Sequence, residues 1–428
     1  MTARAETFYY RGLEVGAHEL VGHYQLDDHR FRERVDFDPS LRLDTPAVKA
    51  VAQLWYLISG LSYFKAGAAR RIDLGATPVG SAGRALFEAA LRDGLGEFSF
   101  RNNLPLDDVE IVGGVDSSAY SPSLDPRRVL VPFGGGVDSV VTITQLNVEL
   151  DRALFVVSPA SGRFDSLEAT AAVTGLVIVR ATRSLDSQIL AGDTSFLRGH
   201  VPVTTMVTLL GAVAAIATGR GAVVMSNEHS SSVPNIRWRG VDVNHQWSKS
   251  WAAEVLVGES LAELVGSNFT VASYLRNRSE LWVAQVFSRY PEYHHVFRSC
   301  NRAFTQETAR RAVQWCGECD KCLFINLILA PFLERAVLSE IFGSEPLSDP
   351  TLEAQLRTLV GLGVDHKPFE CVGDPDESAA ALTRVATLPA WRDVHHLREV
   401  ARMVSPAVSF VDLLKPRGPS RVPAHWLR

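Results

Sequence analysis

Residues 129–139, VLVPFGGGVDS, join a short apolar run to three consecutive glycines and then to the start of an expected helix. This order predicts a buried strand, a tight loop and a helix. Three glycines lose much backbone entropy on folding, so a turn alone rarely needs them. They let the backbone approach phosphate, with loop amides and the helix N-terminus facing its charge. We predict a phosphate-binding loop made of Gly134, Gly135, Gly136, Asp138 and Ser139.

Two side chains of this loop have more than one possible role. Asp138 can hold Mg²⁺ or orient the loop, and Ser139 can donate its hydroxyl to a phosphate or cap the helix. The alternative for the whole segment is a tight strand-to-helix turn without a ligand.

Short β-branched runs alternate with helical stretches on the C-terminal side of the loop. The runs lie at 154–157, 176–179 and 222–225, and the helical stretches at 139–148, 167–173 and 203–217. This alternation predicts an α/β fold with a parallel sheet and helices on both faces. Ligands bind at the carboxyl ends of such strands. Asn227 and Glu228 follow the fourth run, so Glu228 is a candidate ligand for Mg²⁺ or a substrate hydroxyl, or an ordinary loop acid.

The rest of the chain divides into regions of different character. Residues 1–120 are expected to be mainly helical, with helices at 48–66 and 85–94, and a turn-rich linker follows at 116–123. We predict a nucleotide-binding domain at 126–298 and a C-terminal region at 299–428.

Five cysteines are present, and three of them, Cys316, Cys319 and Cys322, lie within seven residues. With Cys300 upstream as the candidate fourth ligand, four thiolates suit a closed structural zinc site. An iron–sulfur cluster needs the same donors and is the rival interpretation. Three buried free thiols are the remaining alternative. We expect zinc to attach the C-terminal region to the α/β domain.

Polar residues elsewhere are candidates for catalysis. Lys249 can neutralise phosphate charge, while His245 is either a base or a structural hydrogen-bonding group. Cys371 is the cysteine that the metal does not need. A cation from His366 or Lys367 nearby would lower the pKa of this thiol and make Cys371 a usable acid or base. The alternative is that Cys371 is a small buried residue in a loop.

Composition limits the class of protein. The 428 residues carry a formal net charge of −5, which argues against a large basic nucleic-acid-binding face. The first residues lack the apolar core of a signal peptide. The longest apolar stretch, 48–64, contains Lys49, Gln53, Ser59 and Ser62 and is too polar to span a membrane. We expect a soluble, cytoplasmic protein without a membrane partner.

The glycine loop is neither a Walker loop nor G-x-G-x-x-G. It resembles the S-G-G-x-D-S loop of the PP-loop ATP pyrophosphatase superfamily, with Gly134 in place of the first serine. That resemblance implies ATP cleavage between the α and β phosphates and adenylation of a substrate.

Most of the chain resembles the ATP-dependent UDP-N-acetylmuramoyl-L-alanyl-L-glutamate epimerase family (MurL-type) of peptidoglycan synthesis. The resemblance is carried by the loop, the cysteine cluster and the segments 58–66, 94–98 with 101–102, 199–204, 226–228, 243–249, 299–302 and 365–371. Val137 stands where the family is expected to have lysine, so ATP binding is expected to depend more on Lys249.

The resemblance implies a mechanism. Adenylation neutralises the terminal glutamate carboxylate of UDP-MurNAc-L-Ala-L-Glu, a base removes the α-proton, an acid returns one to the other face, and hydrolysis releases AMP. Cys371 and His366 are the candidates for proton transfer, with Lys249 and Lys367 beside them. ATP and Mg²⁺ are the implied cofactors. A ligase that adds L-Glu to UDP-MurNAc-L-Ala is an implied functional link.

Three other interpretations of the function remain. A PP-loop enzyme similar to 7-cyano-7-deazaguanine synthase would explain residues 129–322, but not the first 120 residues or the region of Cys371. A tRNA-modifying PP-loop enzyme should carry a basic surface, which the net charge disfavours. The third is a non-catalytic, zinc-stabilised nucleotide-binding regulator.

Overall fold

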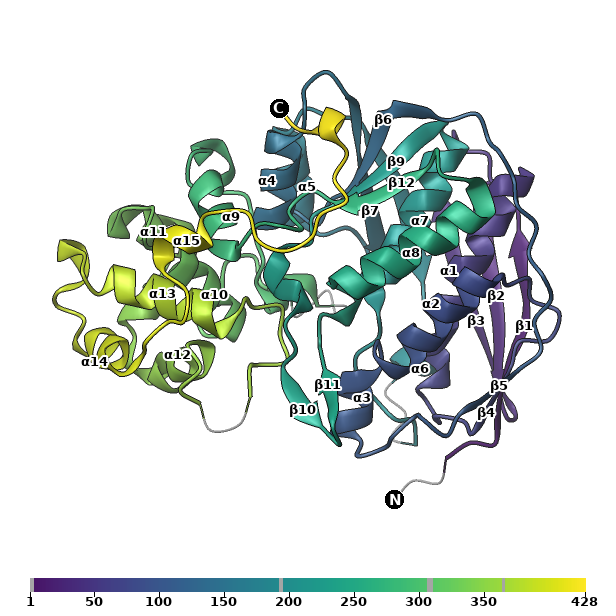
Figure 1. Ribbon diagram of the computed structural model, residues 1–428, viewed down its shortest axis with the longest axis horizontal. Helices are drawn as coiled ribbons and strands as arrows, with labels where there is room; N and C mark the ends of the chain where they lie inside the picture. Colours follow the sequence, from purple (N-terminus) through teal and green to yellow (C-terminus); the bar gives the residue numbers. More distant parts are fainter. Residues whose placement is uncertain (1–3, 192–194, 306–310, 364–365) are drawn as a thin grey trace.

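A computed structural model describes residues 4–191, 195–305, 311–363 and 366–428. Its main feature is one ten-stranded sheet with strand order β12-β9-β6-β7-β8-β3-β2-β1-β4-β5 (Figure 1). In that order the strands are Thr270–Ser273, Arg220–Met225, Asp125–Pro132, Asp151–Pro159, Ile178–Ser184, His29–Phe37, Glu19–Leu26, Thr7–Val15, Arg71–Asp73 and Glu110–Val112.

The half of the sheet from β12 to β8 is parallel throughout, and β6–β9 include the four predicted strands. Side chains of β6 alternate between two cores: Leu130 packs in one, and Val129 and Val131 pack in the other. Both faces of this half are therefore covered by helices, as predicted for an α/β fold.

The two cores belong to different sets of helices. One holds α1 (Pro46–Phe64), α2 (Ser81–Arg92), α7 (Val203–Ala217) and α8 (Trp251–Val265). The other holds α4 (Val137–Gln145), α5 (Asp165–Val173), α9 (Glu280–Phe287) and α10 (Asp320–Leu329).

The expectation of a mainly helical N-terminal region was wrong for residues 7–37, which form the antiparallel strands β1, β2 and β3. Strand β3 also pairs antiparallel with β8, so the N-terminal strands extend the parallel half of the sheet. Buried positions of β3 alternate as Phe31, Glu33, Val35 and Phe37. Glu33 is a charged residue at a buried position of this alternation. Its carboxylate is tolerated there because it forms an ion pair with Arg183 at 2.6 Å.

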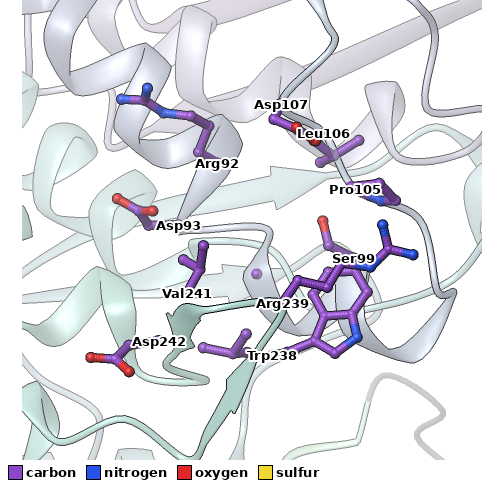
Figure 2. Close-up of a pocket in the computed structure, with 12 residues that line it drawn as sticks. Arg92, Asp93, Ser99, Pro105, Leu106, Asp107, Trp238, Arg239, Val241 and Asp242 are labelled. Carbon is purple, nitrogen blue, oxygen red and sulfur yellow. The ribbon is translucent and has the colours of Figure 1, made fainter.

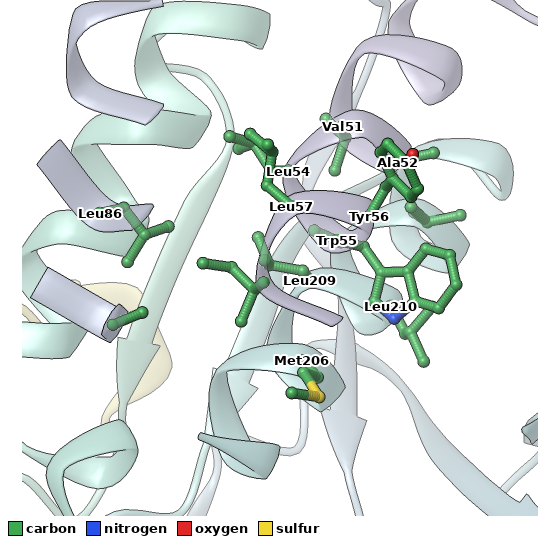
Figure 3. Close-up of a cluster of buried hydrophobic side chains, with 14 of the residues drawn as sticks. Val51, Ala52, Leu54, Trp55, Tyr56, Leu57, Leu86, Met206, Leu209 and Leu210 are labelled. Atoms are coloured by element: carbon green, nitrogen blue, oxygen red, sulfur yellow. The ribbon is translucent and has the colours of Figure 1, made fainter. Parts of the chain in front are cut away.

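The helices expected in the N-terminal region are present as α1 and α2. Thr45 caps α1 through its hydroxyl, which accepts from the amide of Val48, and Pro46 occupies the first turn. Figure 3 shows Trp55 and Leu57 of α1 with Leu209 and other side chains of α7 in one buried cluster. This packing fixes the N-terminal helices on one face of the sheet. Within the described ranges, no helix has both the length and the apolar character needed to cross a membrane.

The C-terminal region is helical and packs beside the α4 face of the sheet (Figure 1). After α10 it contains α11 (Arg335–Phe342), α12 (Glu353–Leu359), α13 (Pro375–Val385), α14 (His395–Met403) and α15 (Phe410–Leu413). The chain then returns to the sheet, where the carbonyl of the buried Trp426 accepts from the amide of Asn147 at 2.9 Å. The predicted limits 1–120, 126–298 and 299–428 stay a prediction.

Candidate active site

The glycine loop lies between β6 and α4, at the carboxyl end of its strand. Gly135 has φ +72°, and a Cβ there would lie 3.0 Å from the Cα of Leu167. A Cβ on Gly136 would lie 2.8 Å from the hydroxyl of Ser299, whereas Gly134 has no atom that close. The fold therefore needs glycine at 135, a side chain at 136 would require the Ser299 hydroxyl to move, and Gly134 stays open on the cavity side. The hydroxyl of Ser139 donates to the carbonyl of Gly136 at 3.0 Å.

A cavity of about 370 Å³ lies against this loop. It brings together seven predicted site residues: Gly134, Gly136, Asp138, Ser139, Asn227, Lys249 and Cys371. Its apolar wall contains Phe133, Phe155, Val157, Val203, Val207 and Met225. An apolar wall with a few convergent polar groups is the usual form of a small-molecule site.

The end of β9 supplies the predicted acidic segment. The side-chain amide of Asn227 donates to the hydroxyl of Ser273 at 3.0 Å and so links the ends of β9 and β12. Glu228 is buried, and its carboxylate accepts from the hydroxyl of Ser230 at 3.1 Å. Burial and the charge of Glu228 raise the pKa of Asp138 above its ordinary value. The carboxylate at the end of β9 thus acts electrostatically on the carboxylate of the loop.

Lys249 balances these acids. Burial alone would lower the pKa of Lys249, but Cys371, Glu228 and Asp138 together raise it above its ordinary value. The ammonium group is therefore charged at neutral pH and stands on the cavity wall.

Arg276 positions two of these segments and was not predicted from the sequence. Its guanidinium donates to the carbonyl of Glu228 at 3.0 Å and to the carbonyl of Lys249 at 2.6 Å. The side chain is 1% exposed and forms an ion pair with Glu254 at 2.9 Å. A buried arginine on backbone carbonyls holds both segments at fixed positions, although nothing in its local sequence marks it.

Cys371 lies at the meeting point of three cations. The ammonium of Lys249 donates to its sulfur at 3.4 Å, His245 hydrogen-bonds to the thiol, and Lys321 donates to its carbonyl oxygen. Burial raises the pKa of the thiol, but Lys249, His245 and Lys321 outweigh burial and lower this pKa to about 6. Cys371 is therefore a thiolate at neutral pH, which is the nucleophilic and basic form.

His245 connects Cys371 to a carboxylate. Its Nδ1 lies 2.5 Å from a carboxylate oxygen of Glu97, on α3 (Gly96–Arg101), and Arg101 also contacts Glu97. Burial lowers the pKa of His245, but Cys371 and Glu97 together raise it to about 9. The neighbouring ring of His200, 4.3 Å away between centroids, has its pKa lowered to about 4 by burial and by His245. The result is a Glu97–His245–Cys371 chain in which His245 carries the proton.

Two amides hold the Cys371 segment in place. The side chain of Asn235 donates to the carbonyl of Pro368 at 2.6 Å, and that of Gln246 donates to the carbonyl of Val372 at 3.1 Å. The thiol is thereby fixed by backbone anchors on both sides.

The two predicted neighbours of Cys371 are placed differently. His366 contacts the carbonyl of Lys367 at 3.0 Å and packs on Phe369, and no contact among the described residues joins it to Cys371. Lys367 is buried, and its ammonium has no hydrogen-bond partner within the described ranges. Burial lowers the pKa of Lys367. Asp365, which belongs to the same sequence segment, lies outside the described residues.

The sulfurs of Cys300, Cys316, Cys319 and Cys322 lie within 4.8 Å of one another and can hold a metal ion. Cys322 is 3.4 Å from Cys319 and 3.6 Å from Cys316. Four thiolates at Zn–S distances of 2.3 Å in a tetrahedron lie about 3.8 Å apart, close to these distances. Lys321 sits between two of the cysteines, so the cluster also positions a cation at Cys371.

Comparison with known proteins identifies relatives along the whole chain. Residues 1–274 match the family model of the MurL N-terminal domain, and residues 296–411 match that of the MurL C-terminal domain. No solved structure gives a significant match.

Three curated relatives carry the name UDP-N-acetyl-alpha-D-muramoyl-L-alanyl-L-glutamate epimerase. The Micromonospora sp. protein is 35% identical over 99% of this chain and 97% of its own length. The Salinispora tropica protein is 39% identical over 80% of this chain and 74% of its own length. The Xanthomonas oryzae pv. oryzae protein is 35% identical over 89% of this chain and 86% of its own length. The chain therefore belongs to the MurL family.

Proposed function

We propose that this protein is an ATP-dependent epimerase that converts the terminal L-glutamate of UDP-MurNAc-L-Ala-L-Glu to D-glutamate for peptidoglycan synthesis. The names of the three relatives support the reaction and its substrate. The observation that carries the chemistry is a cysteine thiolate, Cys371, on the wall of the same cavity as the glycine loop.

In this proposal the loop binds the phosphates of ATP as a PP-loop, and the apolar wall of the cavity takes the adenine. The substrate carboxylate attacks the α-phosphorus, which forms an acyl adenylate and releases pyrophosphate. Lys249 lies between the loop and Cys371, where its charge offsets the charge that develops on the phosphate. Asp138 and Glu228 fit a Mg²⁺ site, because burial and the charge of Glu228 raise the pKa of Asp138 above its ordinary value, and Mg²⁺ would supply charge neutralisation at the phosphates.

The second half of the reaction is proton exchange at the glutamate Cα. An adenylated carboxylate is neutral and withdraws electrons, so the neighbouring C–H bond becomes acidic. The Cys371 thiolate takes this proton and becomes a thiol, while the electron pair delocalises onto the acyl group. Protonation of the opposite face gives the D-configuration, and water then cleaves the acyl adenylate into AMP and the free carboxylate.

His366 stays our proposed group for the opposite face, with Lys367 beside it. Two groups that act on opposite faces of one carbon do not need to touch. The missing contact between His366 and Cys371 therefore does not count against this pairing.

We also propose that the four-cysteine cluster holds a structural zinc ion, since four thiolates leave no open position for a substrate. A cytoplasmic location fits a nucleotide-linked substrate and ATP. The substrate further requires a ligase that adds L-Glu to UDP-MurNAc-L-Ala.

The test is an incubation with UDP-MurNAc-L-Ala-L-Glu, ATP and Mg²⁺ in D₂O. We expect D-glutamate, deuterium at its Cα, AMP and pyrophosphate. For Cys371→Ala we expect deuterium incorporation to fall about 10²- to 10⁴-fold, the usual contribution of one acid–base group, with pyrophosphate still released. Pyrophosphate release in the same sample is the control for a folded, ATP-competent variant.

Two results would contradict this reading. Full deuterium incorporation by Cys371→Ala would remove Cys371 from the proton transfer. Absence of D-glutamate, with pyrophosphate released on a deazapurine carboxylate instead, would favour an enzyme similar to 7-cyano-7-deazaguanine synthase.

A further inference from the structure

A second cavity, of about 250 Å³, opens between α3, the end of α2 and the hairpin of β10 (Ile236–Trp238) and β11 (Val241–Val243). Figure 2 shows Arg92 and Asp93 on one side of it and Trp238, Arg239 and Ser99 on the other. Among the described residues, the two cavities have no lining residue in common.

The hairpin presents an aromatic plane and a cation together. Its two-residue turn has φ +51° at Arg239 and φ +81° at Gly240. Positive φ is common for glycine and uncommon for arginine, so Arg239 occupies this turn against its backbone preference. The result is a guanidinium that lies over one face of the Trp238 ring, 4.9 Å from its centroid, so a stacked ligand has to use the opposite face.

The remaining walls combine charge with apolar surface. Leu106 and Val243 are buried and apolar, whereas Asp93, Asp107 and Arg92 line the same space. An aromatic plane stacks with a nucleobase, carboxylates accept from ribose hydroxyls, and guanidinium groups bind phosphate oxygens. This combination suits a nucleoside diphosphate better than a purely apolar or purely anionic ligand.

The second cavity is linked to the Cys371 site through residues that lie next to its lining. Gly96 lines the cavity, and the next residue, Glu97, holds His245. The ring of Trp238 packs against Phe100 at 6.1 Å, and Phe100 packs against Phe369 at 5.4 Å, two residues before Cys371. The row of rings formed by Trp238, Phe100 and Phe369 therefore connects the wall of the second cavity to the Cys371 segment.

We infer that this cavity binds the uridine diphosphate end of the substrate, with uracil stacked on Trp238 and the diphosphate near Arg239. The inference rests on the proposed function, because that function defines which substrate reaches the Cys371 site. ATP uses the other cavity, so the two nucleotides do not compete.

The test measures UDP binding by calorimetry on the full chain saturated with a non-hydrolysable ATP analogue, which keeps the loop occupied. We expect one UDP per chain, and a loss of affinity of about tenfold to a hundredfold in Trp238→Ala, as for the loss of one base–aromatic stack. Arg239→Gln should also weaken UDP. Arg42→Gln is the control, since Arg42 is an exposed arginine that pairs with Asp44 and does not line the cavity.

A kinetic arm separates this inference from the proposed function. In Trp238→Ala, KM should rise for UDP-MurNAc-L-Ala-L-Glu and stay unchanged for MurNAc-L-Ala-L-Glu, which lacks the UDP group.

If the wild type epimerises the substrate but Trp238→Ala binds UDP normally and keeps its KM, the cavity assignment is wrong and the proposed function stands. If the wild type binds UDP through Trp238 but does not epimerise, the proposed function fails and the nucleotide site stands. Equal displacement of UDP by ADP at this cavity would overturn its assignment to uridine.

Discussion

The hydrogen-bonded pair of Cys371 and His245 makes the proposed activity depend on pH. The thiol has its pKa lowered to about 6 and the imidazole has its pKa raised to about 9. The thiolate–imidazolium form therefore exists between these values. We expect kcat/KM to rise as pH passes about 6, when the thiol deprotonates, and to fall as pH passes about 9, when His245 loses its proton.

Glu97 contributes to the basic limb of this profile. Cys371 and the carboxylate of Glu97 together raise the pKa of His245, so Glu97→Gln should move the fall in kcat/KM to lower pH. Glu110→Gln, which changes an exposed acid on β5, should leave both limbs in place. The measurement is a pH–rate profile of the wild type and of the two variants. If the basic limb of Glu97→Gln is not shifted, the titration of His245 does not produce that limb.

Lys249, His245 and Cys371 were predicted from the sequence as candidate groups, but Glu97 was not, and neither was the pairing of these side chains. Lys249 and Cys371 were both predicted as catalytic, and the structure brings them into contact. Glu97 and His245 lie 148 positions apart, and only the fold joins them. Their contact depends on how α3 meets the segment after β11, which no local pattern encodes.

Among the elements, the segments after β9 and before α8 are held by the buried Arg276, which follows β12. Arg276→Met would leave the carboxylate of Glu254 buried without its partner, which typically costs about 3–5 kcal/mol. We expect a markedly lower unfolding temperature and weaker ATP binding, because Glu228 and Lys249 lose their shared anchor. Arg34→Met removes an exposed ion pair on β3 and should change the unfolding temperature little. Equal unfolding temperatures for the two variants would contradict the anchoring role.

Elements with a strong local pattern were predicted well. The apolar run 203–217 corresponds to α7, and the four apolar runs correspond to β6–β9. The strands β1–β3 were missed because their pattern is mixed: Glu33 is fully buried within β3, and its partner Arg183 lies 150 positions away. A buried position for a charged residue can be predicted only when the partner of its charge is known.

For the whole molecule, the four-cysteine cluster should attach the C-terminal region to the rest. Cys300 lies where the C-terminal region begins and Cys319 stands at the start of α10, so a bound ion would join the beginning of this region to α10. We expect one zinc ion per chain, and its loss in Cys319→Ser with a lower unfolding temperature and faster proteolysis after residue 299. Cys371→Ser should keep its zinc. A zinc-free wild type with unchanged stability would refute the structural role.

The arrangement of the regions could not be read from the sequence. The turn-rich segment 116–123 suggested a boundary, and the structure gives no helix or strand there. The pairing of β3 with β8 nevertheless carries the sheet across it. Such a pairing depends on contacts between distant strands, whereas linker composition reports only local backbone preference.

The lengths of the outermost strands have a consequence for how this protein behaves at high concentration. The sheet ends in β12 and β5, which are four and three residues long, so little unpaired backbone is offered to another molecule. Short terminal strands are a common protection against edge-to-edge aggregation. A fragment that began at residue 126 would lose β3 and uncover the seven-residue β8 instead. We would expect such a fragment to self-associate through that strand, while the full chain stays dispersed.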